Sequence, residues 1–369
     1  MADKKDGMNY APTAHKPQPV VKPGEFRFAA AYFDHGHIFG QINGLTEAGA
    51  QLTIIYERDP QKLEQLRQKF PAAKVARSFD EVLDSDVHLV TAAAIPCERG
   101  PIGCQVMRAG KDYLTDKCPF TTLEQLAVAE KTVAQTGKKY MVYYSERVHV
   151  ESAWYVDTLI QDGAIGDIVH MEIFGPHRLG KGGRPAWFFE KQKYGGILTD
   201  IASHQFDQFL HYTRQSGGQV VHARVDNRAN PDKPELEDVG QAVLILDNGV
   251  QCFSRVNWFT PDGLRCWGDG RSFITGTKGY IEVRKYFDFG RSEQGNLIFL
   301  ADQHSEQVID VNGKVGYPFF GLLILDCLNR TEKAMTQRHA FAAARLSMQA
   351  QLIADLQRGF KKISPDKIC

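Results

Sequence analysis

The order of segments between residues 26 and 145 constrains the fold of this chain more than any other feature. Short apolar stretches of strand character alternate there with amphipathic stretches of helical character. The expected strands are 26–33, 52–57, 87–96, 112–119 and 139–145, and the expected helical stretches are 34–45, 60–70, 99–109 and 121–136. This alternation predicts βαβ units, a parallel sheet and right-handed crossovers. We therefore expect a doubly wound α/β domain over residues 25–147.

The second half of the chain has a different order, in which strands follow one another with tight connections. After a helix at 150–161, the expected strands are 167–175, 220–226, 240–246, 250–258, 272–275, 280–285, 297–301 and 307–311. The tripeptide Asp247-Asn248-Gly249 is typical of a β-hairpin. Helices are expected again at 320–337 and 339–359. This order predicts an α+β domain over residues 148–369, built on a mostly antiparallel open sheet.

Composition narrows the class of protein. A chain of 369 residues is long enough for two domains, and its 44 basic and 44 acidic residues give no support for a nucleic-acid partner. No apolar run is long enough to span a membrane. The seven scattered cysteines fit reduced thiols and a cytoplasmic location, and their spacing matches no common zinc pattern, so we expect no metal. Residues 1–24 are rich in proline and are expected to form an extended arm.

A dinucleotide site would lie at the carboxyl ends of the first domain's strands, which is where Rossmann-like folds bind NAD or NADP. The usual fingerprint G-x-G-x-x-G would follow the first strand. When Gly40 is aligned with the third glycine, His35 and His37 occupy the first two positions. We expect these residues to lie at the cofactor, with the helix-start amides of Ile38 to Gly40 holding the pyrophosphate.

Further cofactor contacts are expected along the same edge of the sheet. Glu57 ends the second strand, about 20 residues after the glycine-like turn, where an acid can accept both ribose hydroxyls. Arg58 beside it could accept a 2′-phosphate, which leaves NAD and NADP open. Ala94 and Pro96, at the end of the third expected strand, complete this set. Acids also end strands without any function, so Glu57 alone does not decide the matter.

The stretch Gly195 to Asp207 predicts a helix with two unlike faces. Asp200 and His204 are four residues apart and share its polar face with Asp207. A carboxylate beside an imidazole orients the ring and raises its pKa, which suits proton transfer near neutral pH. Gly195 and Gly196 would let a ligand approach the backbone closely. The alternative is a solvated polar stripe, although such stripes usually carry longer side chains.

Two of these motifs, in this order, resemble those of the Gfo/Idh/MocA family of oxidoreductases. The segment A-G-K-D-Y-L-T-D-K-C-P places Asp116 and Lys117 on the family's E-K and Cys118 on its proline. The stretch from Gly195 to Asp207 matches G-G-x-x-x-D-x-x-x-H-x-x-D at every position. The resemblance covers residues 26–358 and departs from the family at the missing glycines and at Cys118. It implies NAD(P)-dependent hydride transfer at a secondary hydroxyl or ketone of a sugar, glycoside or cyclitol.

The resemblance also implies roles for individual residues. Lys117 and His204 would form the proton relay, with Asp200 as the partner that orients His204. The substrate would contact Arg147 and the loop residues His177, Arg184 and Trp187, and the indole face suits a sugar ring, although Trp187 could equally be ordinary loop packing.

Two other functions stay open. One is a hydrolase or lyase of the same fold that cleaves a glycoside through a tightly held NAD, and the other is a non-catalytic nucleotide- or sugar-binding protein. For assembly, we expect a homodimer or homotetramer, because the second domain has helices for one sheet face only. The residues assigned to the exposed face are Val243, Ile245, Cys252, Ser254, Val256 and Trp258. The proline-rich arm could wrap a neighbouring subunit.

Overall fold

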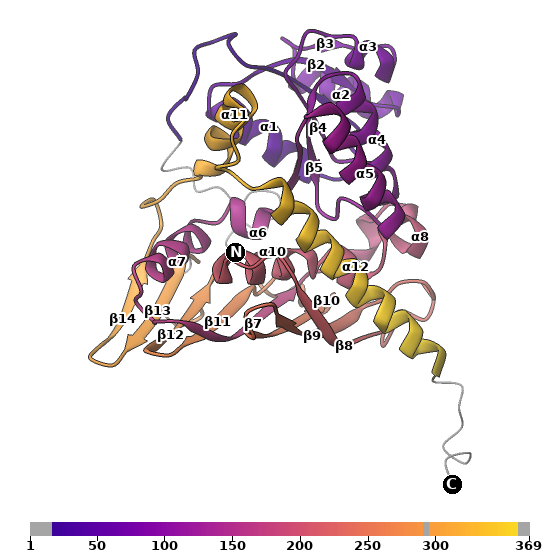
Figure 1. Cartoon of the computed structure of the whole chain (residues 1–369). Coiled ribbons are helices and arrows are strands. Elements are labelled where there is room, and N and C mark those ends of the chain that lie inside the picture. The colour runs from indigo at the N-terminus through magenta and orange to yellow at the C-terminus, as the bar shows by residue number, and fades with distance from the viewer. Residues whose placement is uncertain (1–16, 291–294, 361–369) are drawn as a thin grey trace. The chain divides into compact units, whose positions relative to one another are not determined.

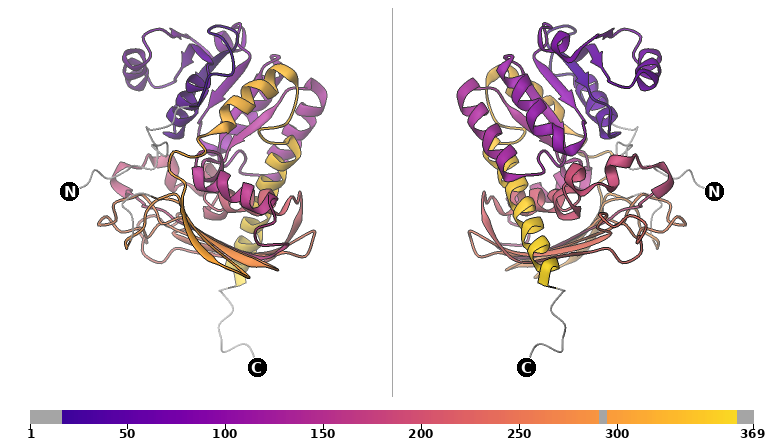
Figure 2. Two further views of the ribbon diagram at one scale, coloured as in Figure 1. Left: turned by 90° about the vertical axis from the view of Figure 1, so that its left-hand side faces the viewer. Right: turned by 90° about the vertical axis from the view of Figure 1, so that its right-hand side faces the viewer.

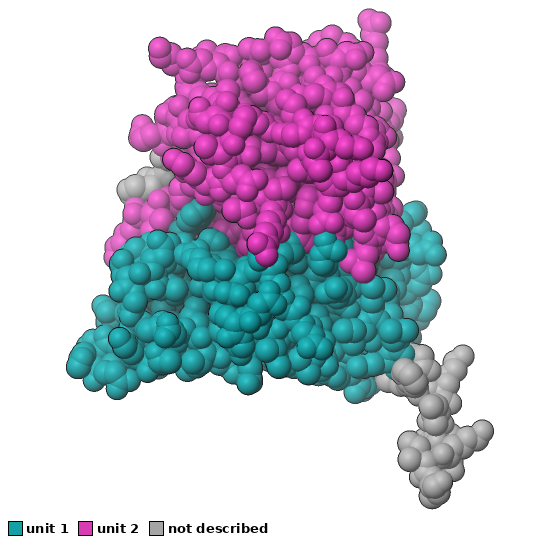
Figure 3. All heavy atoms as spheres, in the orientation of Figure 1, with its two compact units in different colours: residues 1–7, 152–312, 342–369 teal, residues 8–151, 313–341 magenta. Residues whose placement is uncertain are grey.

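The structure, a computed structural model, describes residues 17–290 and 295–360 (Figure 1). The chain divides into two compact units, coloured separately in Figure 3. Unit 2 comprises residues 8–151 and 313–341, and unit 1 comprises residues 1–7, 152–312 and 342–369. Residues 313–341, which the sequence assigned to the second domain, group with unit 2.

Unit 2 contains a six-stranded sheet in the order β3-β2-β1-β4-β5-β6, and every strand pair is parallel. The strands are β1 (Arg27–Ala31), β2 (Gln51–Tyr56), β3 (Lys74–Val75), β4 (Leu89–Ala92), β5 (Asp112–Asp116) and β6 (Tyr140–Tyr143). The predicted doubly wound α/β domain is therefore confirmed. The two-residue strand β3 was not predicted, because a segment this short has no measurable period.

The helices of unit 2 are α1 (His37–Glu47), α2 (Pro60–Lys69), α3 (Phe79–Leu83), α4 (Pro96–Arg108), α5 (Leu123–Thr136), α6 (Ser145–Val148) and α11 (Pro318–Asn329). The bounds of α1, α2, α4 and α5 lie within three residues of the prediction, whereas the short helices α3 and α6 were not predicted. Local signals explain several ends. The side chain of Asp59 accepts backbone N–H bonds at the start of α2, and Thr122 does the same for α5. Gly137, at φ 63°, ends α5 in the left-handed conformation.

Helix α11 explains why residues 313–341 join unit 2. A Cβ atom on Gly44 of α1 would lie 2.1 Å from the ring of Phe320, so the bare glycine lets α11 pack closely on α1. The sequence predicted that this helix continues to residue 337, but it ends at Asn329. The carboxylate of Asp326 accepts the backbone N–H groups of Lys333 and Ala334, at 2.9 and 2.7 Å, and so turns the chain away from the helix.

The arm predicted at residues 1–24 is described only from residue 17 onward. The N–H of Val20 donates to the carbonyl of Ala48 at 2.9 Å, and Pro19 and Val21 lie beside Gly49 at the end of α1. Residues 17–24 therefore lie along unit 2 of their own chain. The prediction that the arm of residues 1–24 wraps a neighbouring subunit stays a prediction, and residues 1–16 lie outside the described residues.

Unit 1 contains an eight-stranded sheet in the order β14-β13-β12-β11-β7-β10-β9-β8. The strands are β7 (Ile168–Pro176), β8 (Gly218–Asp226), β9 (Val239–Leu246), β10 (Gln251–Asn257), β11 (Arg271–Gly276), β12 (Gly279–Arg284), β13 (Leu297–Asp302) and β14 (Glu306–Asp310). All pairs are antiparallel except β7 with β10. The mostly antiparallel sheet is confirmed, and the hairpin at Asp247–Gly249 joins β9 to β10.

The other elements of unit 1 are α7 (Glu151–Gln161), η1 (Lys181–Gly183), η2 (Ala186–Phe189), α8 (Lys191–Tyr194), α9 (Ile197–Asp200), α10 (Ser203–Thr213) and α12 (Gln337–Phe360). Among them, α7, α10 and α12 are longer than four residues. Helix α12 begins in unit 2 and continues into unit 1. Within the described ranges, no helix combines the length and the apolar character that crossing a membrane requires.

Strand register corrects the faces that the sequence assigned to this sheet. Cys252 pairs with Leu244, whereas Phe253 pairs with Val243, and paired residues share a face. Cys252, Ser254, Val256 and Trp258 are therefore on the buried face, where α9 and α10 pack. Figure 2 shows the sheet nearly edge-on, with helices on one side of its central strands. Of the predicted set, Val243 and Ile245 lie on the other face. The other four residues were assigned to the wrong face, because a shift of one residue along a strand exchanges the two faces.

Candidate functional site

The turn after β1 is held in place by the ends of the two neighbouring strands. The N–H of Tyr32, just after β1, donates to the carbonyl of Tyr56 at the end of β2. The N–H of His35 donates to the carbonyl of Ala93, just after β4, and both distances are 3.0 Å. Helix α1 then begins at His37, and Gly36 before it offers no side-chain cap. This is the turn that carries the phosphate in dinucleotide-binding folds.

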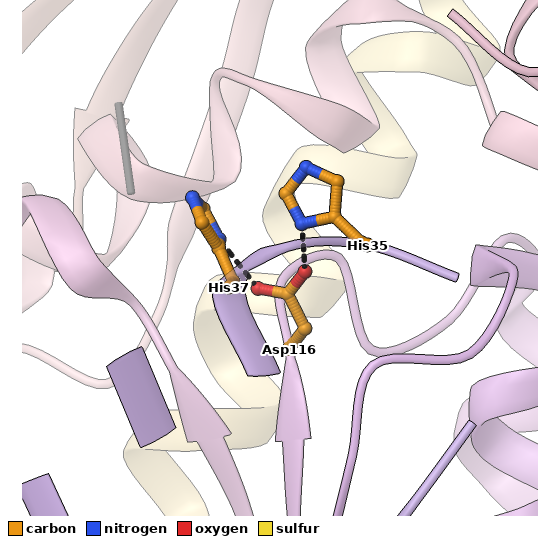
Figure 4. A group of neighbouring side chains, drawn as sticks. All are labelled: His35, His37 and Asp116. Carbon is orange, nitrogen blue, oxygen red and sulfur yellow. Dashed lines mark hydrogen bonds and ion pairs between the residues drawn. The ribbon is translucent and has the colours of Figure 1, made fainter. Parts of the chain in front are cut away.

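Both histidines of this turn contact one carboxylate at the end of β5. The Nδ1 atom of His35 lies 2.7 Å from Oδ2 of Asp116, and Nδ1 of His37 lies 2.8 Å from Oδ1 (Figure 4). The backbone N–H of Lys117 also donates to Oδ1, at 2.8 Å. Asp116 is fully buried, whereas the side chain of His35 is 22% exposed. The structure thus brings together four of the residues that the sequence assigned to the cofactor or to catalysis.

Arg99 is a member of this cluster that the sequence did not indicate. It lies in the first turns of α4 with 1% exposure, and its guanidinium is 3.2 Å from Oδ2 of Asp116. It also donates to the carbonyls of Ala94 and Cys118, at 2.7 and 3.1 Å. Burial alone would raise the pKa of Asp116, but His37, Arg99 and His35 outweigh it and hold that pKa well below its usual range. The sequence could have indicated this role only through the position of Arg99, shortly after a predicted core strand.

The cluster of His35, His37 and Asp116 has the ligand spacing of a metal site, but the charges around it do not suit a metal ion. The ligand atoms of His35, His37 and Asp116 lie within 4.8 Å of one another. The 2.8 Å contact between Nδ1 of His37 and Asp116 is a hydrogen bond, and Nδ1 of His35 lies at ion-pair distance from the same carboxylate. Arg99 and Lys117 place two cations beside a single carboxylate. These charges favour an anion over a divalent cation at this position.

Glu57 lies directly after β2, as predicted, with 4% exposure. Its carboxylate accepts the N–H groups of Phe33 and Arg58, both at 2.7 Å, and that of Asp59 at 3.0 Å. This arrangement fixes the carboxylate at the position where Rossmann folds bind the adenosine ribose.

Arg58 is paired with two other carboxylates. Its guanidinium donates to Asp34 at 2.9 Å and to Glu98 at 2.9 and 3.1 Å, and it lies 4.9 Å from the ring centroid of Tyr32. Asp34 also lies 3.6 Å from the ammonium group of Lys62, so this rim has three acidic side chains, with Glu57, against two basic ones. The carboxylate after β2 and the start of α1 fit a dinucleotide, and the charge around Arg58 fits one without a 2′-phosphate.

The other residues predicted at the cofactor have structural roles in this unit. Gly40 is needed for packing, because a Cβ there would lie 2.8 Å from the hydroxyl of Tyr143. Ile38 is fully buried, and the carbonyl of Ala94 is held by Arg99. Pro96 is the first residue of α4, a position that suits proline.

In unit 1, the predicted helix over the Gly195 stretch is divided into α9 and α10. The hydroxyl of Ser203 donates to the carbonyl of Asp200 at 2.8 Å, and the N–H of His204 bonds to the carbonyl of Ile201 instead. The side chain thus replaces one bond of the helix ladder, which is a common cause of a helix break. Asp200 and His204 consequently lie on different helices, and the prediction of one continuous helix is wrong.

The role predicted for Gly196, beside Gly195, is also corrected. Both have positive φ values, 88° and 94°. A Cβ on Gly196 would lie 2.2 Å from the side chain of Gln351 on α12, so this side chain occupies the space that the sequence assigned to a ligand. The first N–H groups of α9 are satisfied by Glu237, at 2.9 Å, and by Gln351, at 3.0 Å.

The polar residues of this stretch are nearly inaccessible. Asp200 is 7% exposed, His204 1% and Asp207 fully buried, which excludes the alternative of a solvated stripe. One turn after His204, Gln208 accepts a hydrogen bond from the ammonium group of Lys285 at 2.7 Å. Lys285 is 3% exposed and is a further polar residue that the sequence did not indicate. Buried polar groups in such number are typical of a functional site.

Aromatic rings surround the predicted substrate residues of unit 1. The ring of His177 lies 4.2 Å from Trp267 and 5.5 Å from Trp258. The guanidinium of Arg184 lies 4.5 Å from the ring of Phe188 and 5.1 Å from Trp258. Burial lowers the pKa of Arg184, against the opposite effect of Asp200.

Trp187 is half-buried in η2, and its ring lies 6.1 Å from that of Phe188. The indole rings that contact His177 are those of Trp258 and Trp267.

The structure describes the predicted residues in two groups. Lys117 and Arg147 belong to unit 2, whereas Asp200, His204, His177, Arg184 and Trp187 belong to unit 1. Arg147 lies in α6 with 2% exposure.

Comparison with protein families gives two matches that follow the two halves of the chain. Residues 33–144 match the model described as "Oxidoreductase family, NAD-binding Rossmann fold". Residues 154–282 match the model described as "GFO/IDH/MocA C-terminal domain".

Individual relatives agree with this result. A putative oxidoreductase from Erwinia carotovora atroseptica SCRI1043 has 42% identity and a TM-score of 0.87, over 89% of this chain and 99% of that one. An uncharacterized oxidoreductase, sll0816, of Synechocystis sp. is 25% identical over 64% of this chain and 68% of its own length. D-xylose dehydrogenase of Paenarthrobacter nicotinovorans is 24% identical over 41% of this chain and 40% of that protein.

Proposed function

Since the chain belongs to the GFO/IDH/MocA family of oxidoreductases, with an NAD-binding Rossmann domain, we propose that it oxidises or reduces a carbohydrate or polyol. The reaction is hydride transfer between the nicotinamide cofactor and a secondary hydroxyl or ketone of a sugar, glycoside or cyclitol. The observation that carries this proposal is Lys117, which is 4% exposed and directly follows β5 at the cofactor edge of the sheet. A relative named D-xylose dehydrogenase supports the substrate class.

The cofactor, when bound, supplies the hydride acceptor or donor. The side chains of the chain supply the proton chemistry. Lys117 hydrogen-bonds the reacting oxygen and keeps it oriented, and His204 takes the hydroxyl proton as the hydride leaves carbon. Asp200 orients His204 and accepts a neighbouring hydroxyl. In the reverse direction, His204 returns the proton to the ketone oxygen.

Substrate binding is assigned to the aromatic residues of unit 1 together with His177 and Arg184. Aromatic faces pack against the C–H surfaces of sugar rings, while Arg184 and His177 donate hydrogen bonds to hydroxyl groups. Arg147, buried in α6, is proposed as a further contact to the substrate.

The proposal is tested by substitution of the two relay residues. A panel of aldoses, glycosides and cyclitols is screened for reduction of NAD, and the best substrate is used for the variants. Lys117→Ala and His204→Ala should each lower turnover by about 10²- to 10⁴-fold, which is the usual contribution of a general acid–base group. Cofactor affinity, measured by calorimetry, should change little.

Matched controls remove similar side chains elsewhere on the same units. Lys131→Ala replaces an exposed lysine of α5, and His170→Asn replaces a half-exposed histidine of β7. Both should keep the turnover of the unaltered protein. Near-native turnover in His204→Ala, on a substrate that the unaltered protein oxidises, would contradict the proposed relay.

A further inference from the structure

Arg184 differs from the other basic residues of its segment because it has no carboxylate partner. Four other basic side chains lie in segment 178–193, and each of them forms an ion pair. The pairs are Arg178 with Asp262, Lys181 with Asp232, Lys191 with Glu237, and Lys193 with Glu190. Arg184 is partly exposed and forms no ion pair with any residue that the structure describes. Its charge is therefore available to an anion that comes from outside the chain.

Backbone carbonyls hold the guanidinium of Arg184 in a fixed orientation. Its Nε donates to the carbonyl of Leu179 at 2.8 Å, and its Nη2 donates to the carbonyl of Arg178 at 3.3 Å. These bonds use two of the five N–H groups of a guanidinium and leave three, on Nη1 and on the other side of Nη2. Two parallel N–H groups of this kind form the fork that binds both oxygens of a carboxylate. The carbonyls thus orient the side chain without neutralising its charge.

Aromatic rings take the place of water around this cation. The guanidinium lies 4.5 Å from the ring of Phe188 and 5.1 Å from that of Trp258. The ring of Trp258 also lies 5.5 Å from that of His177, so Arg184 belongs to the aromatic cluster that is assigned to the substrate. Burial lowers the pKa of Arg184, and Asp200 acts in the opposite direction. A bound anion would compensate for the hydration that the guanidinium has lost.

The amount of charge at this position fits a carboxylate better than a phosphate. Arg184 supplies one positive charge, and the charge of Asp200 acts against any further anion. The guanidinium of Arg178 is directed to the carbonyls of Leu264 and Cys266, at 2.5 and 2.9 Å. A carboxylate carries one negative charge, whereas a phosphate monoester carries about 1.5 to 2 at neutral pH. One unpaired guanidinium balances the first of these groups and not the second.

We propose that Arg184 binds a carboxylate group of the substrate through this fork, so that the enzyme acts on an acidic sugar, a uronate or an aldonate, in preference to the neutral parent compound. This inference rests on the proposed function and narrows it, because the group that contacts Arg184 is then a carboxylate instead of a hydroxyl. Arg184 determines specificity by holding a part of the substrate that does not react. Its loss should therefore affect the acidic substrate and spare the neutral one.

The test compares compounds that differ in a single group. The pairs are D-glucuronate with D-glucose, D-galacturonate with D-galactose, and D-gluconate with D-glucitol, and D-glucose 6-phosphate is the phosphate probe. Each compound is titrated calorimetrically into the full chain and is assayed for reduction of NAD. For at least one pair, the acid should bind about 10- to 100-fold more tightly than the neutral compound and have a higher kcat/KM, because its hydrogen bonds to Arg184 are charge-assisted.

Variants of Arg184 separate recognition of the carboxylate from support of the loop. Arg184→Gln removes the charge and should lower kcat/KM and affinity for the acid by about 10- to 100-fold, with little change for the neutral compound. Arg184→Lys keeps the charge but not the fork and should lie between the two. Arg228→Gln removes an exposed arginine of unit 1 and should change neither value. Circular dichroism verifies that each variant is folded.

Each outcome decides a different statement. An equal loss for the acid and the neutral compound in Arg184→Gln would show that the side chain only supports the loop, which would overturn this inference and leave the proposed function in place. Preference for the neutral compounds or the phosphate, or no binding of any acid, would overturn it as well. Binding of an acid that depends on Arg184, without oxidation of any compound, would support the carboxylate site and contradict the proposed function.

Discussion

At the scale of single residues, buried charge determines the character of the site. Asp116 is completely buried and receives two imidazole rings and a guanidinium. A carboxylate in such a position keeps its charge because its partners replace the water that it loses. The same burial acts on His35 in the opposite direction, because it lowers the pKa of that ring and favours its neutral form.

The stability of the ligand-free protein should therefore fall in mild acid. Burial is the main cause that lowers the pKa of His35 and of His149 to about 4, with His37 as a second cause for both. The unfolded chain binds protons near pH 6.5 and the folded chain near pH 4, so stability is complete above 6.5 and is lost as the pH falls towards 4. The loss should reach roughly 2–3 kcal/mol for each ring at pH 4.

Scanning calorimetry between pH 8 and pH 4.5 measures this loss as a decrease in Tm. The double variant His35→Asn with His149→Gln should show a clearly smaller decrease, because its side chains do not titrate. His304→Asn, in an exposed turn of unit 1, serves as the control. An equal acid sensitivity in the double variant and the unaltered protein would show that other groups are responsible.

At the scale of elements, the turn between β2 and α2 determines which dinucleotide fits. Glu57 is fixed by three backbone N–H groups, and Arg58 is occupied by Asp34 and Glu98. The sequence suggested that Arg58 could accept a 2′-phosphate. Since its charge is already balanced by two carboxylates, a phosphate at this position would face a net negative rim.

We therefore expect this enzyme to bind NAD at least tenfold more tightly than NADP, which is about 1.4 kcal/mol. Glu57→Ala should weaken NAD more than NADP, because it removes a hydroxyl acceptor and a repulsive charge. Glu98→Gln should release Arg58 in part and raise the relative affinity for NADP several-fold. Calorimetry with both nucleotides measures these ratios.

Two controls accompany these variants. Glu57→Gln keeps the size of the side chain and some acceptor capacity, so its effect on NAD should be smaller than that of Glu57→Ala. Glu64→Gln changes an exposed acid on α2 and should leave the ratio unaltered. A preference for NADP in the unaltered protein would refute the expected selectivity.

At the scale of the whole molecule, the outer face of the unit 1 sheet is the surface on which we expect assembly. Phe174 lies 6.3 Å from Phe253 and 5.8 Å from Phe273 on this face, and all three rings are partly exposed. Two arginines cover neighbouring rings, with Arg255 at 4.6 Å from Phe174 and Arg284 at 4.6 Å from Phe299. An aromatic face of this kind, with cations over its rings, is typical of a surface that another protein covers.

We propose that a second copy of the chain covers this face in a homodimer or homotetramer. Light scattering at micromolar concentration should then give a mass of two or four times 41.4 kDa. Val221 and Ile245 are 53% and 42% exposed on the sheet, and Val221→Glu with Ile245→Glu should shift the mass towards the monomer, because each places a charge in the interface.

Leu352→Glu is the control, since Leu352 is half-exposed on α12 rather than on the sheet. It should leave the assembly intact. A mass of 41.4 kDa for the unaltered protein would reject the proposed interface.

The sequence by itself determined most of the longer elements and several of the residue types of the site. The alternation of strands and helices over residues 26–145 gave the parallel sheet, and Asp247-Asn248-Gly249 gave the hairpin between β9 and β10. These features depend on neighbours within a few residues, so periodicity and turn chemistry are sufficient to predict them. The motifs around Lys117 and His204 likewise identified the family.

Only the tertiary structure decided which partners those residues have. Gly196 is a glycine because Gln351 packs against it, and Asp116 is held by Arg99 as well as by the two histidines. The break at Ser203 depends on a single hydroxyl bond, which no periodicity predicts. The two faces of the large sheet also required the strand register, because a shift by one residue exchanges them. Contacts between residues far apart in the chain exist only once the fold has brought them together, and no local pattern encodes them.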